Sequence, residues 1–307
     1  MTICNRQRGS ALLIALVVAA LAALIATAVL ERARQGLARS EALLATERSW
    51  QYASGMTWLA EKMLREALAE GADPAALGDG WSAPFDVPGG MVQGRLQDQQ
   101  ARFNVNALAH PDRAMAAAAA DAFRRLLAEL ELSPVIADEL ADWLDGAVMP
   151  RPGSAANDWY GRHRPPYRTA GVPMVSTSEL RWLRSVDDSA WQVLAPVVSA
   201  LPDTRLRVNV NSAPPELLAA VVSGLGIDQA RRVEADGPYS DLNRFVEHPL
   251  VAGVISPEER LLLTVRSHWY MAVARVVVDG TERNYFRLMG VGVAGYDGFR
   301  FFAQGVP

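Results

Sequence analysis

The chain has 307 residues, half of them hydrophobic, and a formal net charge of −4 at pH 7. This length exceeds one average domain and can bury a substantial core. The slight acidic balance argues against a strong electrostatic footprint for nucleic acid. The only cysteine, Cys4, precedes the first apolar segment, so we expect neither disulfides nor cysteine-based metal or catalytic sites in the rest of the chain.

Residues 11–30 form an uninterrupted apolar run in which Thr27 is the only polar side chain. As an α-helix, residues 10–30 would span roughly 30 Å, which is the thickness of a bilayer core. Arg6 and Arg8 precede the run, and this order favours a cytoplasmic N-terminus. We therefore predict a single-pass membrane anchor.

The residues before the apolar run indicate which kind of anchor this is. The small residues Gly9 and Ser10 precede the run, and no clear small-residue cleavage site follows it, as a secretory signal peptide would require. The order of basic leader, glycine and apolar helix resembles the N-terminus of a type IV prepilin. This resemblance implies that a prepilin peptidase cuts after Gly9 and leaves Ser10 as the first, often N-methylated, residue. An ordinary signal anchor with an incidental glycine is the alternative.

If cleavage follows Gly9, the fifth residue of the mature chain is Ile14. The resemblance implies a glutamate there in pilins and most pseudopilins, where it pairs with the amino terminus of the preceding subunit. A buried carboxylate needs such a partner, and Ile14 cannot form the pair. This departure matches one family of minor pseudopilins, general secretion pathway protein K. It implies a position at the fibre tip, where no subunit precedes.

The helical pattern continues beyond the membrane segment to residues 71–74, where a glycine and a proline end it. We expect Glu61 on a solvated face of this helix. Two separate helices joined near Gly36 are the alternative, because glycine costs a helix interior about 1 kcal/mol relative to alanine. An apolar stripe at helical spacing is predicted from Tyr52, Met56, Leu59 and Met63.

Residues 91–108 alternate enough to predict two short strands around a turn. Residues 111–144 have a helical pattern, within which Ser133-Pro134 predicts an N-cap and a first helical position. Residues 145–175 are irregular and proline-rich, and a loop of this length is unusual unless it binds something or is pinned down. Residues 176–198 predict two short helices.

Two segments nearly repeat each other, ARFNVNAL at 101–108 and LRVNVNSA at 206–213, and each precedes a proline-led helical stretch. We therefore predict two similar helical units entered by similar strands. In the second unit, Gly224-Leu225-Gly226 predicts a helix-hairpin-helix. Residues 205–266 contain seven arginines and eight acidic residues, so binding to DNA phosphates is poorly supported and a structural or protein-binding use is favoured.

Residues 267–307 are rich in β-branched and aromatic residues, and Asp279-Gly280 predicts a hairpin turn. We expect these strands to pair with those near 91–105 in one antiparallel sheet, with the helical region inserted between them. The glycines at 290–295 match a dinucleotide-binding motif, but no helix follows them, so that interpretation fails on context.

Over nearly the whole chain, this organisation resembles the K family of minor pseudopilins. The fold class it implies is α+β: a long N-terminal pilin-like helix packed on a small antiparallel sheet, with a large inserted helical domain containing two helix-hairpin-helix, or SAM-like, units. The expected divisions are a leader, a transmembrane helix, the remaining helix with the first strands, the two helical units, and the last strands. They fall at 1–9, 10–30, 31–105, 106–204, 205–266 and 267–307.

The resemblance also implies calcium in the first helical unit. Oxygen ligands from a long irregular segment suit this ion, which takes six to eight of them in flexible geometry. The acidic cluster contains fewer acidic residues here than the family usually shows. The alternative is that Asp142 and Asp145 are solvated residues at a helix end. The residues expected to form the site are Asp142, Asp145, Asn157 and Asp158.

The function that the resemblance implies is that of a minor pseudopilin at the tip of a type II secretion pseudopilus. There it would initiate or cap the fibre for protein export across the outer membrane, with its C-terminal domain in the periplasm. The implied partners are the minor pseudopilins I and J, other pseudopilins, the prepilin peptidase and the inner membrane.

No catalytic set stands out, because the four histidines are far apart and no nucleophile-elbow or phosphate-loop sequence is present. We therefore expect no enzymatic activity and no nucleic-acid partner. Two alternatives stay open at this point. One is a membrane-anchored DNA-binding or DNA-uptake protein that uses the hairpin motif. The other is a membrane-tethered enzyme that acts through residues 145–175.

Overall fold

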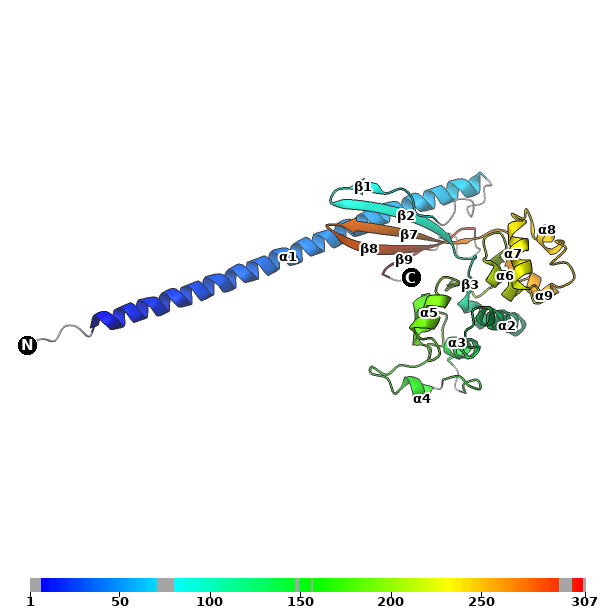
Figure 1. Cartoon of the computed structure of the whole chain (residues 1–307), viewed down its shortest axis with the longest axis horizontal. Coiled ribbons are helices and arrows are strands. Elements are labelled where there is room, and N and C mark those ends of the chain that lie inside the picture. The colour runs from blue at the N-terminus through cyan, green and yellow to red at the C-terminus, as the bar shows by residue number, and fades with distance from the viewer. Residues whose placement is uncertain (1–6, 71–79, 147–148, 156, 293–299, 306–307) are drawn as a thin grey trace, which may run out of the picture.

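A computed structural model describes residues 7–70, 80–146, 149–155, 157–292 and 300–305 (Figure 1). Its longest element is α1 (Gln7–Ala69), a single helix of 63 residues that passes through Gly36 without interruption. The two-helix alternative is therefore wrong, since one glycine weakens a helix this rich in alanine and leucine without ending it. The predicted terminator at 71–74 lies outside the described residues.

The C-terminal half of α1 lies along a five-stranded antiparallel sheet (Figure 1). The central pairing of this sheet joins distant parts of the chain, from Gly90 opposite Val278 to Asp98 opposite Tyr270. The predicted hairpin turn at Asp279-Gly280 is confirmed, with φ angles of 50° and 73°. The strands run in the order β1 (Phe85–Val87), β2 (Gly90–Asp98), β7 (Trp269–Val278), β8 (Thr281–Gly290) and β9 (Arg300–Gln304).

The face of α1 that meets the sheet contains part of the predicted apolar stripe, because Tyr52 and Met56 pack against the core between helix and sheet. Small side chains such as Ala53 and large ones such as Leu64 are fully buried, whereas Met63 is 49% exposed. Glu61, expected on a solvated face, is only 7% exposed, and Arg287 of β8 lies 3.6 Å from its carboxylate. The rest of this face was not predicted because the sheet can approach α1 closely where the helix carries alanine, which a search for large apolar residues does not weigh.

The helical domain is inserted between β2 and β7 and consists of two units (Figure 1). Each begins with a two-residue strand that pairs in parallel with another strand at the end of the same unit, so the predicted repeat is confirmed. The first unit contains β3 (Phe103–Asn104), η2 (Val105–Ala109), α2 (Arg113–Glu129), α3 (Val135–Asp145), α4 (Asn157–Tyr160), η3 (Thr177–Trp182), α5 (Asp188–Leu194) and β4 (Val198–Ser199). The second contains β5 (Val208–Asn209), α6 (Pro215–Val221), α7 (Ile227–Ala235), α8 (Leu242–Val246), α9 (Pro257–Arg260) and β6 (Leu263–Thr264).

Two local predictions need correction. The two strands expected within 91–108 do not pair with each other, because β3 pairs with β4 while β2 joins the large sheet. Ser133 does not cap α3: Pro134 holds the N-cap position without a side-chain hydrogen bond. The backbone carbonyl of Ser133 instead accepts from the backbone N–H of Ile136. A tight turn of the main chain thus replaces the side-chain cap at this helix start.

Candidate functional site

The N-terminal half of α1 is apolar and has no partner within the described chain. A helix long and apolar enough to cross a membrane begins at Ala11, and its most apolar window is not buried at all. Ile14 is 63% exposed. Each such side chain gains about 1.5–3 kcal/mol when it leaves water, so this surface requires lipid or neighbouring helices. The backbone of Gly9 and Ser10 belongs to α1, while leader residues 1–6 lie outside the described part of the chain.

The predicted calcium ligands Asp142 and Asp145 come together at the end of α3, where they share an arginine. Asp142 is 2% exposed, and it accepts the backbone N–H of Arg151 at 2.8 Å and a guanidinium N–H of the same residue. The other end of the guanidinium donates to Asp145 at 3.1 Å. Burial lowers the pKa of Arg151, but its hydrogen bonds and its attraction to both carboxylates outweigh this effect and raise the pKa overall.

The other two predicted ligands have different surroundings. Asn157 begins α4, and its side-chain oxygen accepts from the backbone N–H of Thr169 at 3.1 Å and from the hydroxyl of the same residue at 3.2 Å. Asp158 is exposed in the first turn of α4. Among the described residues, no group of three or more His, Cys, Asp or Glu side chains could hold a metal ion.

As placed, these four residues do not fit a calcium ion, because the Arg151 guanidinium already lies against both Asp142 and Asp145. Calcium at this set stays a prediction, and binding there would require Arg151 to leave. Sequence reasoning missed Arg151 because a single arginine in an irregular segment has no periodic signal. The structure shows that Asp142 is buried, and a buried carboxylate needs a cation beside it.

The asparagines of the repeated motif form an equivalent polar clamp in each helical unit. The side chain of Asn106 accepts from the Met174 backbone N–H at 2.8 Å and donates to two backbone carbonyls, one of them of Met174. Asn211 accepts from the Tyr239 backbone N–H at 2.7 Å and likewise donates to two carbonyls, one of them of Tyr239. These clamps hold loops in place and carry no reactive chemistry.

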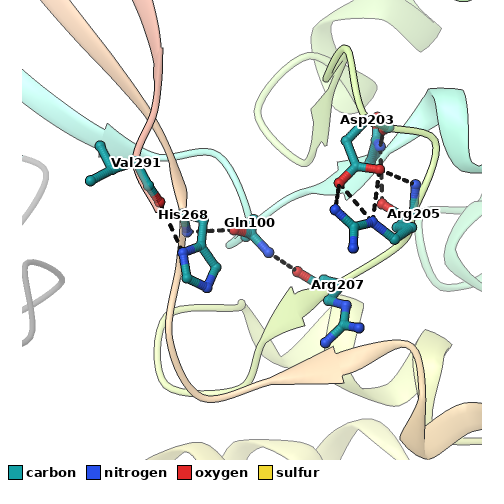
Figure 2. Close-up of polar contacts among 7 residues, drawn as sticks. Gln100, Asp203, Arg205, Arg207, His268 and Val291 are labelled. Carbon is teal, nitrogen blue, oxygen red and sulfur yellow. Dashed lines mark hydrogen bonds and ion pairs between the residues drawn. The ribbon is translucent and has the colours of Figure 1, made fainter. Parts of the chain in front are cut away.

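A hydrogen-bonded junction joins the sheet to the second helical unit, and Figure 2 shows its centre. Gln100, just after β2, donates from its side chain to the Arg207 carbonyl at 2.7 Å and accepts from the backbone N–H of His268 at 2.6 Å. The ring of His268 lies 2.9 Å from the carbonyl of Val291 at the end of the sheet. A polar cavity of about 190 Å³ opens beside these residues.

The carboxylate of Asp98 extends the same junction. Its Oδ2 accepts from the hydroxyls of Ser212 and Ser267 at 2.5 and 2.6 Å and from the side chain of Asn209 at 3.2 Å. The carboxylate of Asp98 therefore links strand β2 to the second unit and to the start of β7. These hydrogen bonds connect the helical domain to the sheet.

The predicted helix-hairpin-helix is confirmed between α6 and α7, with Gly224 at φ +89°. The N–H of Ser223 before the hairpin donates to Glu259, which also accepts from Arg125. Burial raises the pKa of Glu259, but the hydrogen bonds from Ser223 and Ser256 and the charge of Arg125 outweigh this and lower it overall. Glu259 thus already accepts the backbone N–H of Ser223, so this donor beside the hairpin is not available to another acceptor.

Comparisons with known proteins agree with these observations. Two family models, both described as "Type II secretion system (T2SS), protein K", match residues 101–203 and 208–266. The type II secretion system protein K of Aeromonas hydrophila is 34% identical over 76% of this chain and 77% of its own length. The protein of that name from Klebsiella pneumoniae is 31% identical over 91% of this chain and 90% of its own.

A solved structure shares the fold. It comes from the crystal structure of the GspK-GspI-GspJ complex of the enterotoxigenic Escherichia coli type 2 secretion system, and one of its chains superposes with a TM-score of 0.74. The match covers 88% of this chain and 100% of that chain at 23% sequence identity. At this identity the likeness supports the α+β fold with its long helix, small sheet and helical domain.

Proposed function

Because this chain belongs to the type II secretion system protein K family, we propose that it forms the tip of the pseudopilus of that system. It is a minor pseudopilin, a structural component rather than an enzyme. The observation that carries the proposal is α1, one continuous helix whose exposed apolar half lacks an acid at position 14. Its apolar end fits a single-pass membrane anchor.

The proposed location is an inner membrane, with the sheet and the helical domain in the periplasm. Residues 31–44 of α1 add about 20 Å of helix between the apolar run and the first residue of α1 buried against the sheet, Ala45. Arg6 and Arg8 precede the apolar run while Arg32, Arg34 and Arg39 follow it, so charge asymmetry alone is weak and the cytoplasmic N-terminus rests on the resemblance to prepilin leaders.

The tip position follows from the electrostatics of a buried acid. A glutamate at position 14 would be stable in an apolar helix bundle only if a cation, such as the amino terminus of a preceding subunit, neutralised it. Ile14 needs no such partner, so this chain can stand where nothing precedes it. The helical domain at the far end of α1 would then block the addition of a subunit above it.

The proposed partners are the minor pseudopilins I and J, reached through side-by-side packing of the N-terminal helices. The structural neighbour was solved in a complex with proteins of these names. In this chain, the exposed leucines and valines of α1 supply the apolar surface that such packing covers. Together the subunits would initiate or cap the fibre that supports protein export across the outer membrane.

The first test is the N-terminus of the mature chain, determined by mass spectrometry of protein purified from membranes. We expect an N-methylated Ser10, and we expect Gly9→Val to leave the leader attached because the peptidase requires the small residue. Gly36→Ala is the matched control, since it changes a glycine of the same helix and should be processed normally. An intact Met1, or a cut beyond Leu30, would contradict the proposal.

The second test places an acid at position 14 in cells that assemble the whole system and lack the native gene. We expect wild-type chains and the uncharged control Ile14→Gln at one end of each fibre, counted by immunogold labelling. Ile14→Glu should label fewer fibre ends than wild type, because its carboxylate has no partner in the apolar helix bundle where no subunit precedes it. Wild-type chains found along the fibre, or Ile14→Glu found at fibre ends as often as wild type, would overturn the tip assignment.

A further inference from the structure

The segment from 157 to 182, which we call the basic-aromatic loop, carries three arginines with no use in the fold. Arg162, Arg164 and Arg168 are exposed, and their side chains make no hydrogen bond or ion pair with the described part of the chain. Asp158 is the only acid among residues 157–170. In contrast, Arg184 just beyond the loop is paired with the buried Glu139 at 3.2 Å. In an acidic chain, such a local cationic surplus points to a ligand.

Aromatic rings lie among these arginines. Trp182 is 51% exposed, and its ring packs edge-on against Tyr167 with centroids 4.9 Å apart. The hydroxyl of Tyr167 donates to the Trp182 carbonyl at 3.2 Å, and His163 lies 4.4 Å from the ring of Trp159. Tryptophan, tyrosine and arginine are the residues that dominate binding energy at protein interfaces.

The loop is held in one conformation although it has little regular structure. The backbone N–H of Gly171 donates to the Trp143 carbonyl at 2.9 Å, and Asn157 holds Thr169 through two hydrogen bonds. Pro165 and Pro166 fix their own φ angles. A surface ordered in advance loses less conformational entropy on binding, so these contacts favour recognition of a partner.

The position of the loop favours a protein as its ligand rather than the membrane that holds α1. Figure 1 shows α4, which begins the loop, at the edge of the helical domain opposite the sheet and well removed from the N-terminal end of α1. The membrane would surround the apolar half of α1, so the lipid surface would lie far from the three arginines.

We propose that the basic-aromatic loop is a docking site for an acidic segment of a partner protein. Carboxylates of that segment pair with Arg162, Arg164 and Arg168, since guanidinium groups bind carboxylates through two parallel hydrogen bonds. An apolar side chain of the same segment lies on the exposed ring of Trp182. This inference does not depend on the tip assignment, because it concerns a surface that no described part of the chain covers.

The test measures peptide binding to the purified full chain in lipid nanodiscs, by fluorescence anisotropy. The probe is a labelled twelve-residue peptide of alternating glutamate and leucine, and a lysine-leucine peptide is its counterpart. We expect the triple variant Arg162→Ala/Arg164→Ala/Arg168→Ala to weaken binding of the acidic probe at least tenfold. The control triple variant, Arg113→Ala/Arg232→Ala/Arg266→Ala, removes the same charge from exposed sites elsewhere and should change binding less than twofold.

The aromatic contribution is tested in the same assay with a matched pair of exposed tryptophans. Trp182→Ala should weaken binding about fivefold, as expected for loss of an interface anchor. Trp58→Ala, on the exposed side of α1, should leave it unchanged. Thermal unfolding of both arginine triple variants should match wild type, since none of the substituted side chains supports the fold.

Three outcomes would overturn the proposal. One is equal loss of binding in both arginine triple variants, which would indicate attraction by net charge alone. Another is the absence of measurable binding of the acidic probe to the wild-type chain at 50 mM salt. The third is tighter, loop-dependent binding of a 20-bp DNA duplex or of vesicles rich in anionic phospholipid than of the peptide, which would assign the arginines to another class of ligand.

Discussion

The two helical units use the same asparagine clamp but close it over very different lengths of chain. In the first unit, residues 146–173 separate the end of α3 from Met174, the residue that Asn106 holds. In the second, only residues 236–238 separate α7 from Tyr239, the residue that Asn211 holds. The second unit closes its clamp without a long connection, so the clamp alone does not explain the length of the one in the first unit. Part of that connection supports the fold, because Tyr160 is fully buried in the core. Its exposed arginines make no such contribution and call for a functional explanation.

The strongest test of this comparison between the two units is to remove each asparagine clamp. Asn106→Ala leaves three backbone groups of a fully buried site without their partner, and we expect a loss of about 3 kcal/mol or more in the free energy of unfolding. Asn211 is partly exposed, so water can replace some of its contacts, and Asn211→Ala should cost about 2 kcal/mol.

The measurement for both clamp variants is urea unfolding followed by tryptophan fluorescence. Asn243→Ala is the control, because Asn243 is exposed and its loss should change the free energy of unfolding by less than about 0.5 kcal/mol. Equal and small effects at all three positions would show that the clamps do not hold the units together.

A glycine in each unit gives the next largest contrast. Gly146 ends α3 at φ +65°, and an added Cβ would lie 3.0 Å from the Cα of Gly171. We expect Gly146→Ala to cost about 2 kcal/mol, from backbone strain and crowding together. Gly224 at φ +89° has ordinary space around it, so Gly224→Ala should cost only about 1 kcal/mol. The same unfolding assay ranks the two, and the reverse order would contradict the predicted contact between Gly146 and Gly171.

The buried carboxylate of the second unit should make its stability depend on pH. The folded-state pKa of Glu259 is below its ordinary value, so its stabilisation is present above that ordinary value and is lost as the pH falls through the folded pKa. Glu259→Gln should cost about 1–2 kcal/mol at pH 7. The difference between the two proteins should shrink below about pH 4, as measured by urea unfolding across this pH range. A difference that stays constant would show that the charge is not what stabilises the site.

Replacing the arginine of the first unit tests its acid cluster, with the smallest expected effect. Arg151→Gln should lower the free energy of unfolding by about 1 kcal/mol without calcium, because Asp142 loses its charged partner while the arginine side chain itself is partly exposed. Adding 1 mM calcium should restore the thermal midpoint of the variant if the freed acids bind the ion. Wild type should not respond, and a calcium-dependent rise in its midpoint would show that Arg151 gives way to the metal.

Strong local patterns in the sequence predicted most of the fold. The apolar run, the Asp279-Gly280 turn and the glycine hairpin were confirmed, because each depends on residues close together in the chain. The repeated N-V-N motif was confirmed because the sequence shows it twice, although its strands pair with distant segments. The face of α1 that meets the sheet was found only in part, since the partner of Glu61 is Arg287, far along the chain.

The candidate sites were harder to predict for the same physical reason. Asp142 and Asp145 could be identified as a pair at a helix end, but nothing local showed that Arg151 would turn back to neutralise them. The junction at Gln100 was also missed, because its hydrogen bonds reach Arg207 and His268 and are set by how the domains meet. The set Gly9, Ser10 and Ile14 depends on processing and assembly, which stay predictions.

The insertion of the helical domain between two neighbouring strands sets the route of mechanical load. The chain leaves the sheet at Asp98 and returns at Trp269, and the next residue, Tyr270, is the partner of Asp98 in the β2–β7 pairing. In the proposed tip position, a push from the fibre below would enter the helical domain through these two crossings and through the contact of Leu201 with Trp269 and Leu288. Asp98 and Gln100 hydrogen-bond across the crossings, so weakening them would let the helical domain tilt under load while leaving each folded part intact.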